Sequence, residues 1–228
     1  MATFYNFNPE LVRRNVRWDV ASPEAVYEAR LRAVSRTLTR GLADSDGRVD
    51  VSARAVELLR FAVDACPPHG RPLAAPHAAL PWPDDPLLGL WHGANVLREF
   101  RGDGHVAVLI QHEVGPVEAI LLHAAYLSRS PDWFVQTRDW DDASVAAARE
   151  YLTARNFLSP DGLTDGGAKF RLMLEHETDR LADTPFKALG DERSEELLEL
   201  LRSPAVRMVE QKAAPKSFGR MDPANRLV

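Results

Sequence analysis

The sequence lacks the features that mark several common protein classes. Cys66 is its only cysteine, so neither an internal disulfide nor a multi-cysteine zinc site can form. It has no uninterrupted apolar run of about 18 residues, which argues against a membrane-spanning helix. Its first residues lack a basic segment followed by an apolar stretch, and so do not resemble a secretory signal. These absences predict a cytoplasmic protein with no membrane partner.

Motifs of common cofactor sites and catalytic centres are also missing. The sequence has no Walker pattern, no Gly-x-Ser-x-Gly elbow and no glycine-rich loop that could cradle a phosphate. His105, His112 and His123 do not have the spacing of a helical metal site. The sequence therefore predicts no cofactor and no metal, and it assigns no catalytic residue.

An excess of positive charge is absent as well. The net charge is −5, whereas a dedicated nucleic-acid binder usually presents a basic surface. Any DNA-binding surface must therefore depend on a local basic stripe. With 45% hydrophobic and 27% charged residues, the composition is that of an ordinary globular protein.

What is present is mostly helical periodicity. The sequence predicts an all-α protein with one small β-hairpin, at residues 157–164. Three regions follow from the pattern: a helical N-terminal region at 1–112, with a proline-rich strap at 67–86; a winged helix-turn-helix at 113–202; and a flexible tail at 203–228. The expected helices cover 22–41, 51–66, 84–101, 105–112, 115–126, 130–138, 141–156, 164–183 and 191–202.

The order of elements after residue 115 is that of a winged helix-turn-helix. A helix, a short helix and a third helix precede the hairpin, and a long helix follows it. In this arrangement the helix before the hairpin, here 141–156, enters the major groove of DNA. The segment Tyr151–Gly167 resembles the end of the recognition helix, the wing and the following helix start of MarR-type proteins.

Three further segments resemble an actinobacterial family of helix-turn-helix proteins described as SalR-like: Ala2–Phe7, Ala79–Pro86 and Leu90–Val106. The similarity extends to about residue 202. It implies a homodimer, because MarR-type proteins pair through terminal helices. It also implies an additional helical segment before Ala2. The sequence begins inside this pattern, which is expected of a short natural version, of a late start or of a truncation.

The expected recognition helix is acidic where a DNA reader should be basic. It begins with Asp139, Asp141 and Asp142, which would meet the phosphate backbone with like charge. The residues that could contact double-stranded DNA are Ser144, Arg149, Arg155, Lys169 and Arg171.

A second group of polar residues surrounds two glycines. His92 and Asn95 share a helix face, and Gly102 and Gly104 are expected to break the helix that carries them. Arginines suit an anionic small molecule, and an Asp–His pair can move a proton near neutral pH. The candidate ligand-binding residues are His92, Asn95, Arg98, Arg101, Asp103 and His105. In a purely structural interpretation, Asp103 caps a helix and His105 fills an interior position.

Three hypotheses follow. The first is a MarR-like transcriptional regulator that responds to a small molecule. The second is a ligand-binding or catalytic protein of secondary metabolism that does not bind DNA and uses a pocket around Arg101, Asp103 and His105. The third is an interaction scaffold whose acidic helix 141–156 meets a basic partner.

Overall fold

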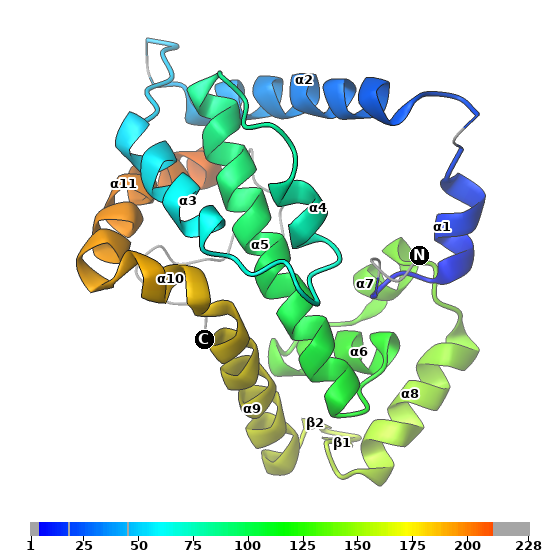
Figure 1. Cartoon of the computed structure of the whole chain (residues 1–228). Coiled ribbons are helices and arrows are strands. Elements are labelled where there is room, and N and C mark those ends of the chain that lie inside the picture. The colour runs from blue at the N-terminus through cyan, green and yellow to red at the C-terminus, as the bar shows by residue number, and fades with distance from the viewer. Residues whose placement is uncertain (1–4, 18, 45, 212–228) are drawn as a thin grey trace. The chain divides into compact units, whose positions relative to one another are not determined.

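A computed structural model describes residues 5–17, 19–44 and 46–211 (Figure 1). The described chain is all-α apart from one two-stranded hairpin, which confirms the predicted fold class. The helices are α1 (Pro9–Asn15), α2 (Pro23–Leu42), α3 (Ala53–Asp64), α4 (Ala74–Ala78), α5 (Pro86–Gln111), α6 (Pro116–Tyr126), α7 (Asp132–Thr137), α8 (Asp142–Ala154), α9 (Asp165–Ala182), α10 (Thr184–Leu189) and α11 (Asp191–Glu210). The strands are β1 (Leu158–Ser159) and β2 (Gly162–Leu163).

The chain forms two compact units, each built from separate stretches of sequence. The first unit, called here the winged unit, contains Met1–Arg17, Gly70–Leu73 and Phe100–Ala182. The second, called the helical unit, contains Trp18–His69, Ala74–Glu99 and Asp183–Val228. Helix α5 is continuous and contributes its first half to the helical unit and its second half to the winged unit.

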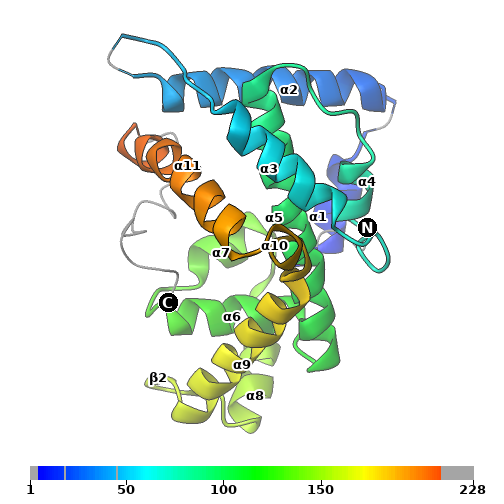
Figure 2. The same cartoon turned by 60° about the vertical axis from the view of Figure 1, so that its left-hand side comes forward.

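The helical unit is organised around α3, which packs against α10 and α11 (Figure 2). Ser52 caps α3: its hydroxyl accepts a hydrogen bond from the backbone N–H of Ala55. The apolar face of α3 then meets α10 and α11 in one buried cluster: Ala55, Leu58, Leu59, Ala62, Leu189 and Leu197. The helical periodicity of these residues explains why α3 forms where the sequence predicts it.

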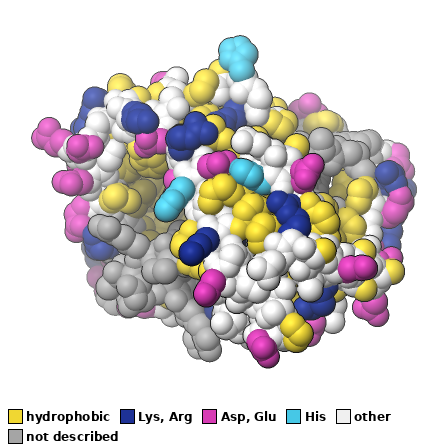
Figure 3. Space-filling view, turned by 90° about the horizontal axis from the view of Figure 1, so that it is seen from below, with side chains coloured by type: hydrophobic (Ala, Val, Ile, Leu, Met, Phe, Trp, Pro, Cys, Tyr) yellow, Lys and Arg dark blue, Asp and Glu magenta, His cyan; other side chains and the backbone are white. Residues whose placement is uncertain are grey.

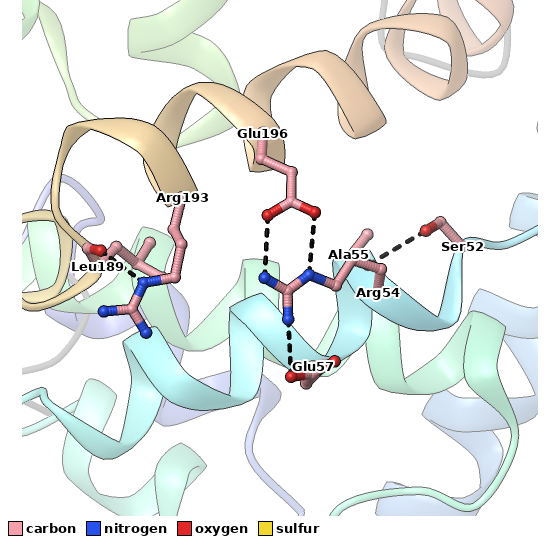
Figure 4. A network of polar contacts seen from close by, with 7 residues as sticks. All are labelled: Ser52, Arg54, Ala55, Glu57, Leu189, Arg193 and Glu196. Atoms are coloured by element: carbon pink, nitrogen blue, oxygen red, sulfur yellow. Dashed lines mark hydrogen bonds and ion pairs between the residues drawn. The ribbon is translucent and has the colours of Figure 1, made fainter.

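Polar contacts fix α3 against α11 at the edge of this cluster (Figure 4). The Arg54 guanidinium donates from Nε and Nη2 to the two carboxylate oxygens of Glu196, both at 2.9 Å, and from Nη1 to Glu57 at 2.7 Å. Arg193 Nε donates to the carbonyl oxygen of Leu189 at 2.8 Å. A bidentate pair of this kind fixes orientation as well as distance.

The winged unit is centred on α6, which contacts α7, α8, α9 and β2. Gly115 precedes Pro116, so α6 begins with proline at its first position, where a missing N–H costs nothing. The core of the unit joins α6 to the end of α5, to α8, to the hairpin and to α9. Its buried residues are Val108, Leu109, Val114, Val117, Leu121, Leu122, Ala148, Leu152, Leu158 and Leu174.

The structure corrects the predicted break in α5. The helix passes through Gly102 and Gly104 without interruption. A Cβ at Gly104 would lie 2.7 Å from Arg71 Nη1 and 3.2 Å from the Leu181 side chain. Glycine is therefore needed here for close packing within the winged unit, and this packing offsets the roughly 1 kcal/mol by which glycine disfavours a helix.

Other helices differ from the prediction as well. Helices α1 and α10 lie outside every predicted helix range. The proline-rich strap contains the short helix α4, with Ala74 buried. Helix α11 continues past Arg202 to Glu210 with Pro204 inside it, because apolar residues follow the proline and Arg207 donates to the carbonyl of Leu42 at 3.2 Å. The rest of the predicted tail, 212–228, lies outside the described residues, as do residues 2–4 of the SalR-like segment Ala2–Phe7.

Among the described residues, no single helix is long and apolar enough to cross a membrane. The bent pair α5 and α6 passes that test together, by length and composition only. Several apolar side chains of these two helices pack in the core of the winged unit, which accounts for their composition.

Candidate functional site

A helix-turn-helix is formed by α7, the turn at residues 138–141, and α8. Asp139 in the turn has a φ of +62°, in the left-handed region that aspartate tolerates better than most residues. Asp141 caps α8, because its Oδ1 accepts from the backbone N–H of Ser144 at 2.7 Å. Hydrogen bonds from the Ser144 side chain and backbone lower the pKa of Asp141 below its ordinary value. Part of the acidity at the start of α8 is therefore explained by capping.

Residues 5–14 hold this turn from the other side. The backbone N–H of Asn8 donates to the carbonyl of Arg138 at 3.0 Å, and its side-chain amide donates to the carbonyl of Asp139 at 2.9 Å. Trp140 Nε1 donates to the carbonyl of Asn6 at 2.9 Å. The Arg14 guanidinium lies 3.0 Å from the Asp139 carboxylate. This ion pair compensates the charge of Asp139, the second acidic side chain near the start of α8.

The wing follows α8 directly. Leu158 pairs with Leu163 and Ser159 with Gly162, in an antiparallel hairpin closed by Pro160 and Asp161. The Thr164 hydroxyl then accepts from the backbone N–H of Gly167 at 2.9 Å and starts α9. The expected wing and the expected start of the long helix are thus both present.

A cavity of about 310 Å³ lies within the winged unit. Its volume is at the lower end of the range for small-molecule sites. The apolar part of its wall comes from Leu109, Ala119, Ile120, Leu122, Phe134 and Leu174. The polar part comes from Asn6, Arg101, His105, His123, Arg138, Arg171 and Glu175.

The polar wall carries more positive than negative charge. Glu175 pairs with two arginines: its Oε2 lies 2.6 Å from Arg101 Nη2, and its Oε1 contacts Arg171. Burial favours a higher pKa for Glu175, but Arg171 and Arg101 outweigh it and hold the pKa below its ordinary value. Burial lowers the pKa of His105 and of His123, so both imidazoles are neutral at neutral pH. The lining therefore offers three guanidinium groups against one carboxylate.

A model of a helix-turn-helix family matches residues 1–215. The chain belongs to this helix-turn-helix family. Comparisons with curated proteins and with solved structures give no match.

In this helix-turn-helix protein the predicted ligand residues divide between the two units. His92, Asn95 and Arg98 belong to the helical unit. The His92 side chain is buried edge-on against Trp82, with ring centroids 4.7 Å apart. Asn95 is 8% exposed and accepts from Arg30 at 3.4 Å, whereas the Arg98 side chain is 75% exposed and contacts Glu99. None of the three lines the cavity of the winged unit.

The other three candidates belong to the winged unit. Arg101 and His105 line the cavity, and His105 Nδ1 lies 2.9 Å from the Thr178 hydroxyl. Asp103 does not line it; its carboxylate accepts from the backbone N–H of Leu73, at 3.0 Å to one oxygen. The structure therefore brings two of the six predicted residues to one site.

Sequence reasoning missed the other polar residues of the cavity: Asn6, His123, Arg138 and Glu175. They come from four separate elements, and only tertiary contacts bring them together. The proximity of Asn6 to the turn has no local sequence signal. The i,i+4 spacing of Arg171 and Glu175 on α9 was the one available indication of a paired, inward-facing charge.

The predicted DNA residues also have different environments. Ser144 is half-buried at the start of α8, Arg149 is exposed on α8, and Lys169 is exposed on α9. Arg171, 12% exposed, lines the cavity. Of the predicted cations, only Arg149 and Lys169 are thus exposed and have no side-chain hydrogen bond or ion pair with another described residue.

Arg155 has a structural role. Its Nη1 donates to the carbonyl of His112 at 3.1 Å, and its guanidinium lies 4.8 Å from the ring centroid of Phe157. Tyr151 and Phe170 also lie against it, at 5.3 and 5.4 Å. Arg155 therefore ties the end of α8 to the wing, to α9 and to the loop before α6.

We expect Arg155→Ala to destabilise the protein by about 2 kcal/mol, because a charge-assisted hydrogen bond and several cation–π contacts are lost together. Arg149→Ala, on the same helix but exposed, should change stability by less than about 0.5 kcal/mol. Urea unfolding of the two variants measures the difference. Equal stability of both would show that the aromatic contacts contribute little.

Proposed function

We propose that this protein is a small-molecule-responsive transcriptional regulator that binds duplex DNA through α8 and the β1–β2 wing, in the manner of MarR-type proteins. The observation that carries the proposal is the α7–turn–α8 motif, which presents an exposed face of α8 in a chain of a helix-turn-helix family. Such families typically insert the second helix of the motif into the major groove.

The exposed face of α8 has chemistry suited to a groove. Its exposed residues are Asp142, Ala143, Ala146, Ala147, Arg149, Glu150, Thr153 and Ala154. Small side chains allow close approach, and an alanine methyl can contact the methyl group of thymine. Arg149 is the one cation on this face and the candidate for a guanine or phosphate contact.

The acidic groups on α8 are the main obstacle to binding. Asp139 is paired with Arg14 and Asp141 caps the helix, which leaves Asp142 and Glu150 facing solvent. On the face seen in Figure 3, acidic and basic side chains of the described residues are interspersed, without a continuous basic field. We therefore propose that affinity comes from two copies of the winged unit in a homodimer, each contributing few phosphate contacts.

The test is a titration of random-sequence duplex DNA, followed by fluorescence anisotropy at about 50 mM and about 200 mM salt. We expect salt-sensitive binding. Arg149→Gln should weaken it by up to about tenfold and reduce its salt dependence, since it removes a phosphate contact and the counterion release that accompanies it. Asp142→Asn should strengthen it, because it removes a charge that repels the phosphates.

Arg202→Gln is the matched control, because Arg202 is exposed on α11 of the helical unit, where it pairs with Glu199. It should leave DNA affinity unchanged. Absence of binding at the lower salt concentration would reject the regulator. Equal effects of Arg149→Gln and Arg202→Gln would reject α8 as the contact surface.

A second candidate function is supported by the cavity alone. A ligand-binding or catalytic protein of secondary metabolism would keep the helix-turn-helix as a scaffold and use Arg101 and His105 in the cavity. The absence of DNA binding, together with binding of a small molecule, would favour this alternative.

A further inference from the structure

One cavity arginine differs from the other two because it has no carboxylate partner among the described residues. Arg101 and Arg171 both contact Glu175. Arg138 Nη1 donates only to neutral oxygens, the Thr137 hydroxyl at 3.0 Å and the Phe134 carbonyl at 3.4 Å. Its Nε is buried without a hydrogen-bond partner among the described residues. Within the described part of the chain, no carboxylate thus compensates the positive charge of Arg138 at the wall of the cavity.

The surroundings of Arg138 are aromatic. Its guanidinium carbon lies 5.2 Å from the ring centroid of Phe134, 5.4 Å from that of Phe7 and 5.9 Å from that of Trp133. The rings hold the cation without neutralising it. Asn6 Oδ1, on the same cavity wall, is likewise buried and has no hydrogen-bond partner in the described part of the chain. Buried polar atoms without partners are rare in native structures, so these two atoms are candidates for a hydrogen bond to a ligand.

The apolar and the charged parts of the cavity wall together indicate which class of ligand would fit. Leu109, Ile120, Leu122 and Phe134 make part of the wall apolar, so a fully polar ion would leave that surface unused. A carboxylate accepts two parallel hydrogen bonds from one guanidinium. A single carboxylate on a small apolar body therefore matches both parts of the wall.

The same arginine is also part of the helix-turn-helix turn. Arg138 is the C-terminal cap of α7, and its carbonyl accepts from Asn8. Asn6, which lines the cavity, accepts from Trp140, the residue before the cap of α8. A ligand that binds and shifts the Arg138 side chain would therefore also shift the residues that determine where α8 begins.

We propose that the cavity of the winged unit binds a small organic carboxylate through Arg138, and that the bound carboxylate changes the affinity for DNA through the turn at 138–141. The second half of this inference rests on the proposed function. The first half does not.

Carboxylate binding is tested on the full chain without DNA, by calorimetric titration and thermal shift. The probes are benzoate and hexanoate, with benzamide and hexanamide as neutral matches and inorganic phosphate as a second anion. We expect both carboxylates to bind and raise the melting temperature, and the amides and phosphate to bind at least about tenfold more weakly. Amides that bind equally well, or phosphate that binds more tightly, would overturn the ligand class.

Two variants locate the site. Arg138→Gln should weaken benzoate binding about tenfold or more. Ala119→Leu leaves every charge in place and fills the cavity from α6, so it should also abolish binding while the helix is retained. Arg202→Gln should bind as the unmodified protein does. Unchanged binding in Ala119→Leu would place the carboxylate outside the cavity and overturn the proposal.

The regulatory half is tested by repeating the duplex titration with saturating benzoate. We expect the DNA affinity to change by about fivefold or more, with no change in Arg138→Gln. Equal affinity with and without benzoate would overturn the regulation and leave the carboxylate site in place. A chain that binds benzoate but no DNA would reject the proposed function and the regulation together, and the carboxylate site would still stand.

Discussion

Gly167→Ala should destabilise the winged unit by about 3 kcal/mol or more, although it adds a single methyl group in a helix. Gly167 lies in the first turn of α9, where the helix packs on the backbone of the wing. A Cβ there would lie 2.1 Å from the carbonyl oxygen of Phe157 and 2.9 Å from Leu163 Cδ1. A backbone oxygen cannot move away as the end of a flexible side chain can, so α9 or the wing must shift.

Gly166→Ala is the matched control for this prediction. Its Cβ would lie 3.3 Å from the nearest atom, the carbonyl oxygen of Asn156. Alanine also favours a helix over glycine by about 1 kcal/mol, so we expect a near-neutral effect. Thermal unfolding of both variants measures the contrast. Similar melting temperatures for the two variants would mean that the wing backbone can move away from a Cβ on α9 at little cost in stability.

Glu175→Gln should destabilise the protein by about 2 kcal/mol at neutral pH, because Glu175 is the one carboxylate of the cavity lining and the carboxylate partner of Arg171. Arg101 would keep only its second ion pair, with Asp179 at 2.9 Å. The loss should depend on pH. The pKa of Glu175 is held below 4.5 in the folded protein, so its contribution is full above pH 4.5 and is lost as the pH falls through the folded value. The two proteins should therefore approach each other in stability under acid conditions.

Urea unfolding at pH 7 and at pH 4 gives this comparison, with Glu199→Gln as control. Glu199 pairs with Arg202 on the exposed side of α11, and its removal should change stability by less than about 0.5 kcal/mol. Benzoate should restore stability to Glu175→Gln more than to the unmodified protein, since it replaces the missing charge. A stability difference that persists unchanged at pH 4 would contradict an electrostatic origin.

Most of the long helices could be predicted from signals within a few residues, such as helix caps and turn sequences. Ser22 before Pro23 and Asp141 before α8 each accept a backbone hydrogen bond at the helix start, as their side chains predict. The hairpin at Pro160–Gly162 was equally clear. Capping and turn formation depend on residues a few positions apart, so the sequence contains the information directly.

For the glycines of α5, by contrast, the local signals gave a wrong prediction. Gly102 and Gly104 predict a break when only local propensity is considered. The helix is continuous because Arg71 and Leu181, distant in sequence, lie where a side chain on Gly104 would be. A glycine can break a helix, or it can leave room for another segment to pack closely against the helix. Which of the two occurs depends on tertiary packing, and the sequence around the glycine does not contain that information.

The candidate site shows the same limit more strongly. Arg101 and His105 were predicted as ligand residues, and they line the cavity; Arg171 was predicted to face DNA and lines it as well. His92, Asn95 and Arg98 share α5 with Arg101 but belong to the other unit. Residue type predicted that these groups carry polar chemistry, but not which of them face one another.

The sequence by itself determined most of the long helices, the all-α class with one hairpin, and the helix-turn-helix plan, because caps, turns and apolar periodicity act over one or two helical turns. Only the tertiary structure decided which group each charged side chain contacts. Arg155 packs on aromatic rings, Asp139 pairs with Arg14, and Arg138 lies at the cavity without a carboxylate partner among the described residues. Charge pairing depends on distances of a few ångströms between groups that can be a hundred residues apart in the chain, and these distances exist only once the core has formed.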